Sequence, residues 1–281
     1  PGIAMFYGGL VRKKNVVNTM MTSIFIIGIG IVMWVLFGYS LSCAPSGNAF
    51  IGDFRWLGLE GVSLTEGYTD DASIPNMVFS AFQMMFAVIT PALITGAVAG
   101  RMKFKSIFVF TIFWSLIVYY PLAHMVWGQG GLLGADGIGA LDFAGGDVVH
   151  ISSGVSALVL CILLGKRHDY EHSIYRIHNI PTVVLGASLL MFGWFGFNAG
   201  SALAADGLAA HAFMTTGVSA AAAMLSWMLC DVIKNKKPTL IGASTGMVAG
   251  LVGITPGAGF IPMWAAVIIG LTTSPAVSYT H

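Results

Sequence analysis

One ionisable side chain, His150, lies in the first turn of a long apolar run. The run extends from Val148 to Gly165 and follows a stretch, residues 139–147, that contains the carboxylate of Asp142 and a glycine pair. If the run spans a bilayer, burying a histidine there is costly and usually indicates a function. The alternative is a histidine that only bonds a neighbouring helix, and the sequence leaves both interpretations open.

An aromatic and a hydroxyl side chain lie where other apolar runs end. Trp127 closes one run within the segment His124–Gly128, and Ser201 follows another within the segment Gly193–Ser201. A tryptophan at a membrane interface usually acts only as an anchor. Its ring face is also the best aromatic surface for holding a small cation. Trp127 is therefore a candidate cation site as well as a candidate anchor.

Three further residues, Phe86, Phe197 and Asp142, lie within or beside such runs. Phe86 is in the run 75–100, and Phe197 lies one helical turn from Ser201. Phenylalanine rings in spans usually pack in the core or face lipid. Asp142 precedes an apolar run and is suited to capping its helix or bonding buried backbone. On their own, these residues predict packing and capping.

Other chemistry is poorly represented in the sequence. There is no P-loop, no pair of carboxylates within a run and no nucleophile elbow, so we predict neither an enzyme nor a bound cofactor. The spacing of His168, His172 and His178 could suggest a metal site. These histidines lie in a charged segment without cysteine, and a solvated loop is the better interpretation. His211, near the end of a run, is interpreted as interfacial.

The composition indicates the class of protein. Of the 281 residues, 56% are hydrophobic and 9% are charged, whereas soluble domains contain about 25% charged residues. We therefore predict an all-α polytopic membrane protein. The net charge of +1 and the lack of a basic patch with interleaved aromatic residues give no sign of a nucleic-acid partner. Cys43, Cys161 and Cys230 are interpreted as small buried hydrophobic residues, not as a disulfide framework.

The apolar runs predict the spans. A helix needs about 20 apolar residues to cross the hydrocarbon core of a bilayer. The predicted spans are residues 15–42, 75–100, 106–127, 147–165, 179–204, 208–233, 239–255 and 260–273, the last of which is short. Residues 1–11 are too few to cross and are interpreted as the end of an earlier span. Small residues such as Gly246 and Gly250 let helices approach closely.

The basic residues support this division. If residues 1–11 count as span one and successive spans alternate in direction, 12 of the 13 Lys and Arg residues fall on one side, and only Arg55 falls on the other. The positive-inside rule makes the basic side cytoplasmic. The acid-rich loop 43–74 is then outside, and we predict a multi-pass protein of the inner (cytoplasmic) membrane.

Several of these segments together resemble the ammonium transporter/Rhesus family, specifically its bacterial ammonium-transporter branch. The similar motifs are PGIAMFYGGLVRKKN (1–15), AHMVWG (123–128), GALDFAGGDVVH (139–150), GWFGFNAGS (193–201) and GLVGITP (250–256), which occur in the family's order. Because several long motifs match in order, over about residues 1–270, the resemblance is specific.

The family implies an eleven-span fold with an inverted five-span repeat, assembled as a homotrimer with one pore per subunit. By this resemblance, residues 1–281 form a single membrane domain that lacks most of span one and spans ten and eleven, and residues 272–281 form an atypical tail. The family's second pore histidine belongs to span ten, and nothing around His281 matches it. We therefore expect that the 281-residue chain alone forms no working pore.

The resemblance also implies a role for each candidate residue. Trp127 and Ser201 match the outer recruitment site, Phe86 and Phe197 the aromatic gate beneath it, His150 the first of two pore histidines, and Asp142 the acid that supports the recruitment site from behind.

The implied function is inward passage of ammonium. A hydroxyl can accept one of the four N–H donors of ammonium, and an indole face attracts its charge. An intact cation is costly in a dry apolar pore, but ammonium, unlike potassium, can split into ammonia and a proton. Imidazole can bond the ammonia and relay the proton.

Two other functions remain compatible with the sequence. The same membrane fold can serve as an ammonium sensor coupled to a cytoplasmic signalling domain. A structural membrane protein is the third interpretation, with Phe86 and Phe197 closing its pore permanently. The expected partners are ammonium or ammonia, the lipid bilayer, further copies of the chain and a cytoplasmic regulatory protein.

Overall fold

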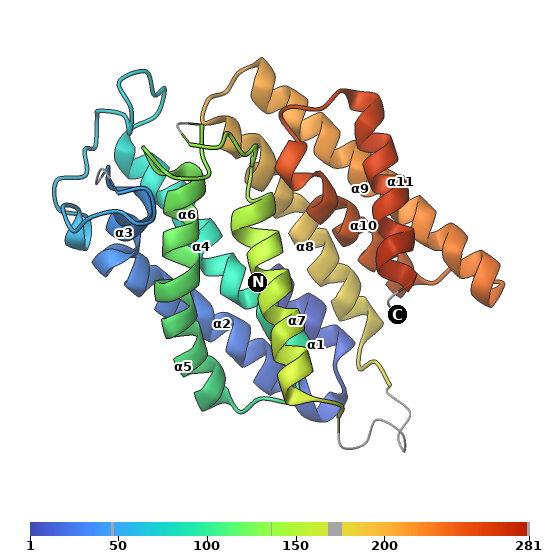
Figure 1. Cartoon of the computed structure of the whole chain (residues 1–281). Coiled ribbons are helices and arrows are strands. Elements are labelled where there is room, and N and C mark those ends of the chain that lie inside the picture. The colour runs from blue at the N-terminus through green and yellow to red at the C-terminus, as the bar shows by residue number, and fades with distance from the viewer. Residues whose placement is uncertain (46–47, 136, 168–175, 280–281) are drawn as a thin grey trace. The chain divides into compact units, whose positions relative to one another are not determined.

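The computed structural model of the protein describes residues 1–45, 48–135, 137–167 and 176–279 (Figure 1). In these ranges the regular structure is helical, apart from one isolated bridge between Gly67 and Pro75. The α-helices are α1 (Gly2–Leu10), α2 (Val16–Met33), α3 (Tyr39–Cys43), α4 (Asn76–Val98), α5 (Phe104–Trp114), α6 (Tyr120–Trp127), α7 (Ser152–Leu164), α8 (Ile180–Ala199), α9 (Gly207–Asn235), α10 (Leu240–Ile254) and α11 (Met263–Tyr279).

Three π-helical turns join or extend these helices. The turn η2 (Trp34–Gly38) connects α2 to α3, η4 (Ser115–Tyr119) connects α5 to α6, and η5 (Gly146–Ile151) leads into α7. A π-turn inserts one residue into a helical turn and often occurs at functional sites. Hydropathy did not predict these turns, because the extra residue leaves the length and polarity of an apolar run unchanged.

Seven helical segments in the described part of the chain are long and apolar enough to cross a membrane. They are Lys13–Cys43, Asn76–Val98, Phe104–Trp127, Gly146–Leu164, Ile180–Ala202, Gly207–Asn235 and Leu240–Gly257. They coincide with the first seven predicted spans, and Met263–Tyr279 is a shorter apolar helix. The prediction of an all-α polytopic membrane protein is therefore confirmed.

The predicted end of the last span is wrong. We expected it to stop at Thr273 and to be followed by an atypical tail, but α11 continues to Tyr279 with Pro275 inside it. Hydroxyl side chains explain the difference, because they bond main-chain carbonyls instead of interrupting the helix. Ser274 is buried and donates to the carbonyl oxygen of Ala223 in α9 at 2.6 Å. Thr273 donates to the carbonyl oxygen of Ile269 at 2.7 Å.

Side-chain caps set the beginnings of three helices. Asn179 accepts a hydrogen bond from the backbone nitrogen of Thr182 in α8. Asp206 and Thr239 cap α9 and α10 in the same way. These side-chain oxygens satisfy N–H groups that have no partner inside their helix.

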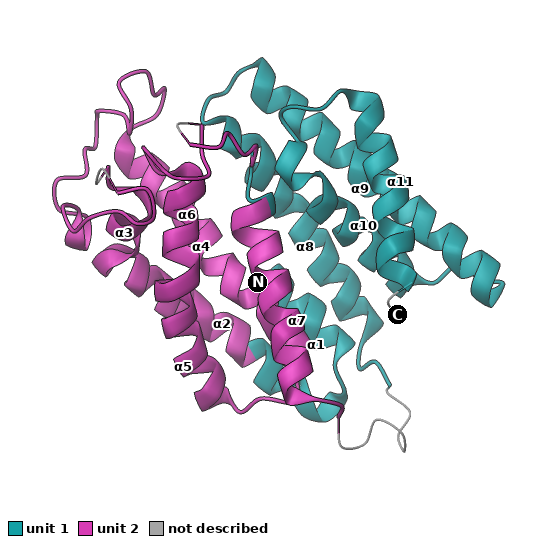
Figure 2. Ribbon diagram, in the orientation of Figure 1, with its two compact units in different colours: residues 1–20, 143–146, 175–281 teal, residues 21–142, 147–174 magenta. Residues whose placement is uncertain are grey.

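The contacts group the chain into two compact units, whereas the sequence suggested one membrane domain (Figure 2). Unit 1 comprises residues 1–20, 143–146 and 175–281, and unit 2 comprises residues 21–142 and 147–174. This division differs from the inverted five-span repeat that the resemblance implies. In that repeat α1 would belong with the helices that follow it, whereas in the structure it belongs to unit 1 with α8–α11.

Glycines allow the helices of unit 1 to pack closely. α1 lies against α8, where a Cβ on Gly9 would come within 2.7 Å of the backbone nitrogen of Val183. The backbone nitrogen of Asn179 also donates to the carbonyl oxygen of Gly9 at 3.1 Å. α9 packs against both α10 and α11, with Gly250 of α10 against the backbone of α9. The small residues thus serve helix packing, as the sequence suggested.

Unit 2 is held partly by buried aromatic rings. Trp34 in η2 is buried, and its indole nitrogen donates to the carbonyl oxygen of Ser80 in α4 at 3.1 Å. Tyr120, at the start of α6, lies with its ring centroid 6.2 Å from that of Trp34. These contacts connect η2 to α4 and α6, the helices that carry Phe86 and Trp127.

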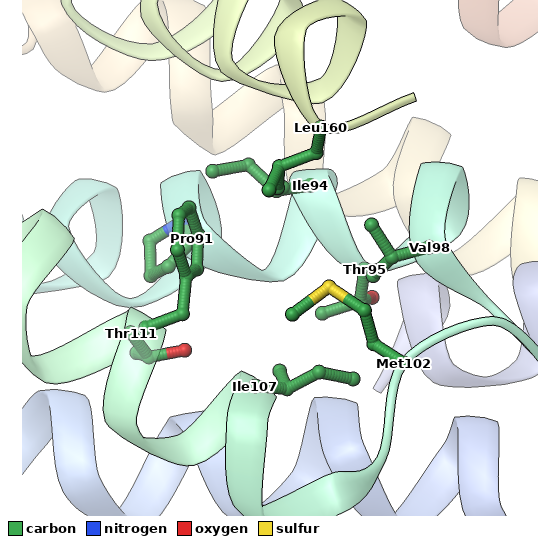
Figure 3. Close-up of a pocket in the computed structure, with 9 residues that line it drawn as sticks. Pro91, Ile94, Thr95, Val98, Met102, Ile107, Thr111 and Leu160 are labelled. Atoms are coloured by element: carbon green, nitrogen blue, oxygen red, sulfur yellow. The ribbon is translucent and has the colours of Figure 1, made fainter. Parts of the chain in front are cut away.

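A small cavity lies beside Pro91 in α4. It is lined by Pro91, Ile94, Thr95, Val98, Met102, Ile107, Phe110, Thr111 and Leu160, from α4, α5, α7 and the turn between α4 and α5 (Figure 3). Its volume is about 10 Å³, which is the space that a single water needs. The lining is mostly apolar, so we interpret the cavity as a packing defect next to a proline that cannot donate a helical hydrogen bond.

Candidate functional site

Three of the predicted site residues meet in unit 2. The ring of Phe86 in α4 is buried and lies edge-on to the indole of Trp127, with centroids 5.6 Å apart and an interplanar angle of 73°. The indole nitrogen of Trp127 donates to the carbonyl oxygen of Asp142 at 3.1 Å. The half-buried indole is therefore fixed both by a neighbouring ring and by a hydrogen bond.

The side chain of Asp142 orders the start of the helix that carries His150. One carboxylate oxygen accepts hydrogen bonds from the backbone nitrogens of Asp147 at 2.8 Å and Val148 at 3.1 Å. These two N–H groups lie in the first turn of η5, where no helical partner exists for them. Asp142 therefore caps the helix, and its main chain at the same time holds Trp127.

His150 lies in the π-turn η5, in unit 2 and half-buried. Two serines bond the backbone around it. Ser152 donates to the carbonyl oxygen of Val148, and Ser153 donates to that of Val149, both at 2.5 Å. These hydroxyls satisfy carbonyls within or beside the π-turn, where the regular α-helical pattern is interrupted. Hydrogen bonds from two serine side chains thus hold the backbone that carries His150.

Phe197 and Ser201 lie together in unit 1. The Ser201 hydroxyl donates to the carbonyl oxygen of Phe197 at 3.0 Å. The Phe197 ring stacks on buried Trp194, with centroids 4.9 Å apart, and the Trp194 indole nitrogen donates to the hydroxyl of Thr255 at 2.9 Å. The serine oxygen keeps acceptor capacity while its hydrogen is directed to the backbone.

The site residues fall into two groups. Phe86, Trp127, Asp142 and His150 belong to unit 2, and Phe197 and Ser201 belong to unit 1. Each group presents aromatic surface together with a few polar atoms, which is the chemistry of a site for a small cation with hydrogen-bond donors.

Sequence reasoning assigned no role to Trp194 or to the π-turn at His150. Trp194 lies in a quoted motif, but only the stacked geometry reveals that it supports the Phe197 ring. Its three-residue spacing from Phe197 was a usable signal, because residues three apart share a helix face.

The described residues contain no cluster of three or more His, Cys, Asp or Glu side chains that could hold a metal ion. Of the three histidines considered for such a site, His168 and His172 lie outside the described residues. The Nε2 atom of His211 lies 2.7 Å from the carbonyl oxygen of Ile261. All three cysteines are free; Cys43 is buried, whereas Cys161 and Cys230 are only partly buried, contrary to the prediction of buried residues.

The fold and site define the protein as a multi-pass helical membrane protein with aromatic, hydroxyl and imidazole groups at its helix ends. The sequence profile of the Ammonium Transporter Family matches residues 1–281. An ammonium transporter of Bacillus subtilis (strain 168) is 53% identical over 96% of this chain and 65% of that protein. The chain therefore belongs to the Ammonium Transporter Family, as the resemblance predicted.

Solved structures agree with this assignment. The crystal structure of Saccharomyces cerevisiae Mep2 is 40% identical, with a TM-score of 0.88 over 98% of this chain and 63% of that one. A structure titled "Sensor Amt Protein" is 28% identical, with a TM-score of 0.87 over 99% of this chain. The chain spans 65% of the length of the Bacillus subtilis relative and 63% of the length of the Mep2 structure.

Proposed function

We propose that this chain belongs to a protein that passes ammonium across the cytoplasmic membrane through a narrow apolar pore. The observation that carries the proposal is the Trp127 indole, which is fixed edge-on to Phe86 and bonded to Asp142. An aromatic ring locked in one orientation favours a cation with little loss of side-chain entropy. Family membership and the name of the Bacillus subtilis relative give further support.

In this proposal Trp127 and Ser201 recruit the ion. The indole face attracts the positive charge of ammonium, and the Ser201 oxygen accepts one of its N–H groups. Phe86 and Phe197 form the gate beneath the recruitment site, and they exclude water and hydrated ions. Asp142 acts from behind by bonding Trp127 and by capping η5.

His150 then acts on the ion beyond the gate. An intact cation is costly to move through an apolar pore, so ammonium enters as ammonia after giving up a proton. Imidazole bonds the ammonia and is suited to relaying the proton, because it exchanges protons near neutral pH. Potassium has no proton to lose and is rejected.

Replacing Trp127 by leucine in the intact protein should weaken ammonium recruitment. A cation–π contact is worth about 0.5–2 kcal/mol, which corresponds to an increase of about 2- to 30-fold in the half-saturating ammonium concentration. The measurement is uptake of radiolabelled methylammonium at limiting concentrations, with potassium as competitor. Trp264→Leu is the matched control, because Trp264 is 67% exposed in α11. Equal affinity and selectivity in both variants would remove Trp127 from the recruitment site.

The proposed topology places the basic turns in the cytoplasm and the loop between α3 and α4 outside. In a variant without native cysteines, a cysteine at exposed Thr65 should react with an impermeant maleimide added to intact cells. A cysteine at exposed Lys103, in the turn between α4 and α5, should react only after the cells are opened. The positive-inside rule is the physical reason. The reverse pattern of labelling would contradict the orientation.

A sensor of ammonium is the second candidate, because one structural neighbour is titled "Sensor Amt Protein". Both functions use the same recruitment residues, and they differ in flux. Methylammonium uptake by the intact protein in cells without other transporters supports transport, whereas binding without uptake supports a sensor. A homotrimeric assembly and a cytoplasmic regulatory protein are further parts of the proposal, which cross-linking and co-purification from native membranes would test.

A further inference from the structure

The outer end of α6 carries another histidine, His124, one turn before Trp127. Its side chain is fully buried, with 0% of the residue exposed. Both ring nitrogens lie at hydrogen-bonding distance from main-chain carbonyl oxygens. Nδ1 is 3.2 Å from the oxygen of Ser42, and Nε2 is 2.8 Å from the oxygen of Asn48. His124 therefore bridges the last turn of α3 and the loop between α3 and α4, which we call the outer loop.

The two contacts restrict the protonation state of the ring. A carbonyl oxygen only accepts hydrogen bonds, and a neutral imidazole has one N–H donor and one nitrogen lone pair. A neutral His124 would direct that lone pair at one of the two carbonyl oxygens in either tautomer. Only a doubly protonated ring donates to both oxygens.

The ring is also enclosed on the side of the glycine-rich segment after Trp127. A Cβ on Gly128 would lie 2.5 Å from Nδ1 of His124. The segment folds back over the helix end, where the backbone nitrogens of Leu133 and Gly134 donate to the carbonyl oxygen of Met125 at 2.8 and 2.9 Å. Because His124 has no exposed surface, a mismatch between a lone pair and a carbonyl oxygen would have no bulk solvent to relieve it.

The loop that His124 contacts also carries the charged side chains of Asp53 and Arg55. Asp53 forms an ion pair with Arg55 at 2.7 Å. The hydrogen bond from Arg55 lowers the pKa of the Asp53 carboxyl. The Asp53 carboxylate in this loop is thus paired with Arg55, and main-chain oxygens, those of Ser42 and Asn48, lie next to the His124 ring.

We propose that His124 is a doubly protonated positioning residue that ties the outer loop to the helix end carrying Trp127. Hydrogen bonds from a charged donor are about twice as strong as neutral ones, so one side chain can hold two separate carbonyls. Any effect of His124 on ammonium recruitment rests on the proposed function of Trp127. The charge of the His124 ring and its bridge between the two carbonyl oxygens do not rest on that function.

Solid-state NMR of the intact protein in lipid vesicles tests the charge directly. The protein is labelled with ¹⁵N in histidine side chains and with ¹³C in asparagine carbonyls. The spectrum is recorded at about pH 8.5, roughly two units above the ordinary histidine pKa. We expect a ring with two protonated nitrogens, one of which transfers magnetisation to an asparagine carbonyl, since Nε2 of His124 lies next to Asn48. The absence of any doubly protonated ring, or a neutral ring next to the asparagine carbonyl, would overturn the proposal.

A matched pair of variants tests the bridge. In His124→Gln, a single amide group replaces the two separated donors, and we expect backbone amides of residues 40–44 and 48–53 to exchange with deuterium about tenfold faster, the effect of losing one hydrogen bond. His211→Gln is the control, because Nε2 of His211 lies next to one main-chain carbonyl, that of Ile261 in unit 1. Unchanged exchange in residues 40–44 and 48–53 of the His124 variant would refute the bridge. The NMR result does not depend on this variant or on uptake, so a failure of the proposed transport function would leave it intact.

Discussion

Methylammonium uptake by the intact protein, relative to potassium uptake, should fall by about a hundredfold when His150 is replaced by alanine, the typical contribution of a positioned proton-exchanging group. In the proposed mechanism ammonium crosses the apolar pore only after it loses a proton. Removing the imidazole removes both a partner for ammonia and a group that relays the proton. The measurements are radiolabelled methylammonium and rubidium uptake in cells that lack other transporters.

Two controls make the His150 experiment specific. His211→Ala removes a histidine whose Nε2 bonds the carbonyl oxygen of Ile261 in unit 1, and it should retain uptake. His150→Gln keeps a polar side chain without proton exchange, and it should remain impaired. Full uptake and unchanged selectivity in a correctly folded His150→Gln protein would exclude proton relay by this residue.

Gly250→Ala should destabilise the protein more than the addition of one methyl group would suggest. A Cβ at this position would lie 2.6 Å from the carbonyl oxygen of Ser219 and 3.0 Å from the Cα atom of Ala220, both in α9. The Ser219 hydroxyl also donates to the carbonyl oxygen of Gly250 at 2.9 Å. Separating the helices would weaken that bond, so we expect the free energy of unfolding to fall by about 1–3 kcal/mol or more.

Gly193→Ala provides a control of the opposite sign. A Cβ on Gly193 in α8 would meet no atom within 4 Å, and alanine is a better helix former than glycine by about 1 kcal/mol. Thermal unfolding of both variants in the same detergent measures the difference. If Gly250→Ala were as stable as Gly193→Ala, the close approach of α9 and α10 would contribute nothing to stability.

Much of the fold could be predicted from local composition. Hydropathy located all seven long spans, because crossing a bilayer requires a continuous apolar segment and nothing in that requirement depends on the neighbouring helices. The same method failed at the end of α11. There, Thr273 and Ser274 lower the hydropathy, but their hydroxyls bond carbonyls of α11 itself and of α9.

The site residues could also be predicted only in part. Motif resemblance singled out Trp127, His150 and Ser201, because residue type and position in a motif can be read from the sequence alone. It could not predict that the indole of Trp127 bonds the main chain of Asp142, or that Trp194 stacks under Phe197. These contacts depend on which side chains face each other once the helices have packed.

By itself, the sequence determined that this is an all-α membrane protein of the Ammonium Transporter Family, since apolar length and residue type are properties of the chain. Only the tertiary structure decided that His150 lies in a π-turn and that His124 lies between two carbonyl oxygens. Hydrogen-bond partners far apart in the chain are chosen by packing. The two acceptors of His124 come from residues 82 and 76 positions away, a separation that no local pattern encodes.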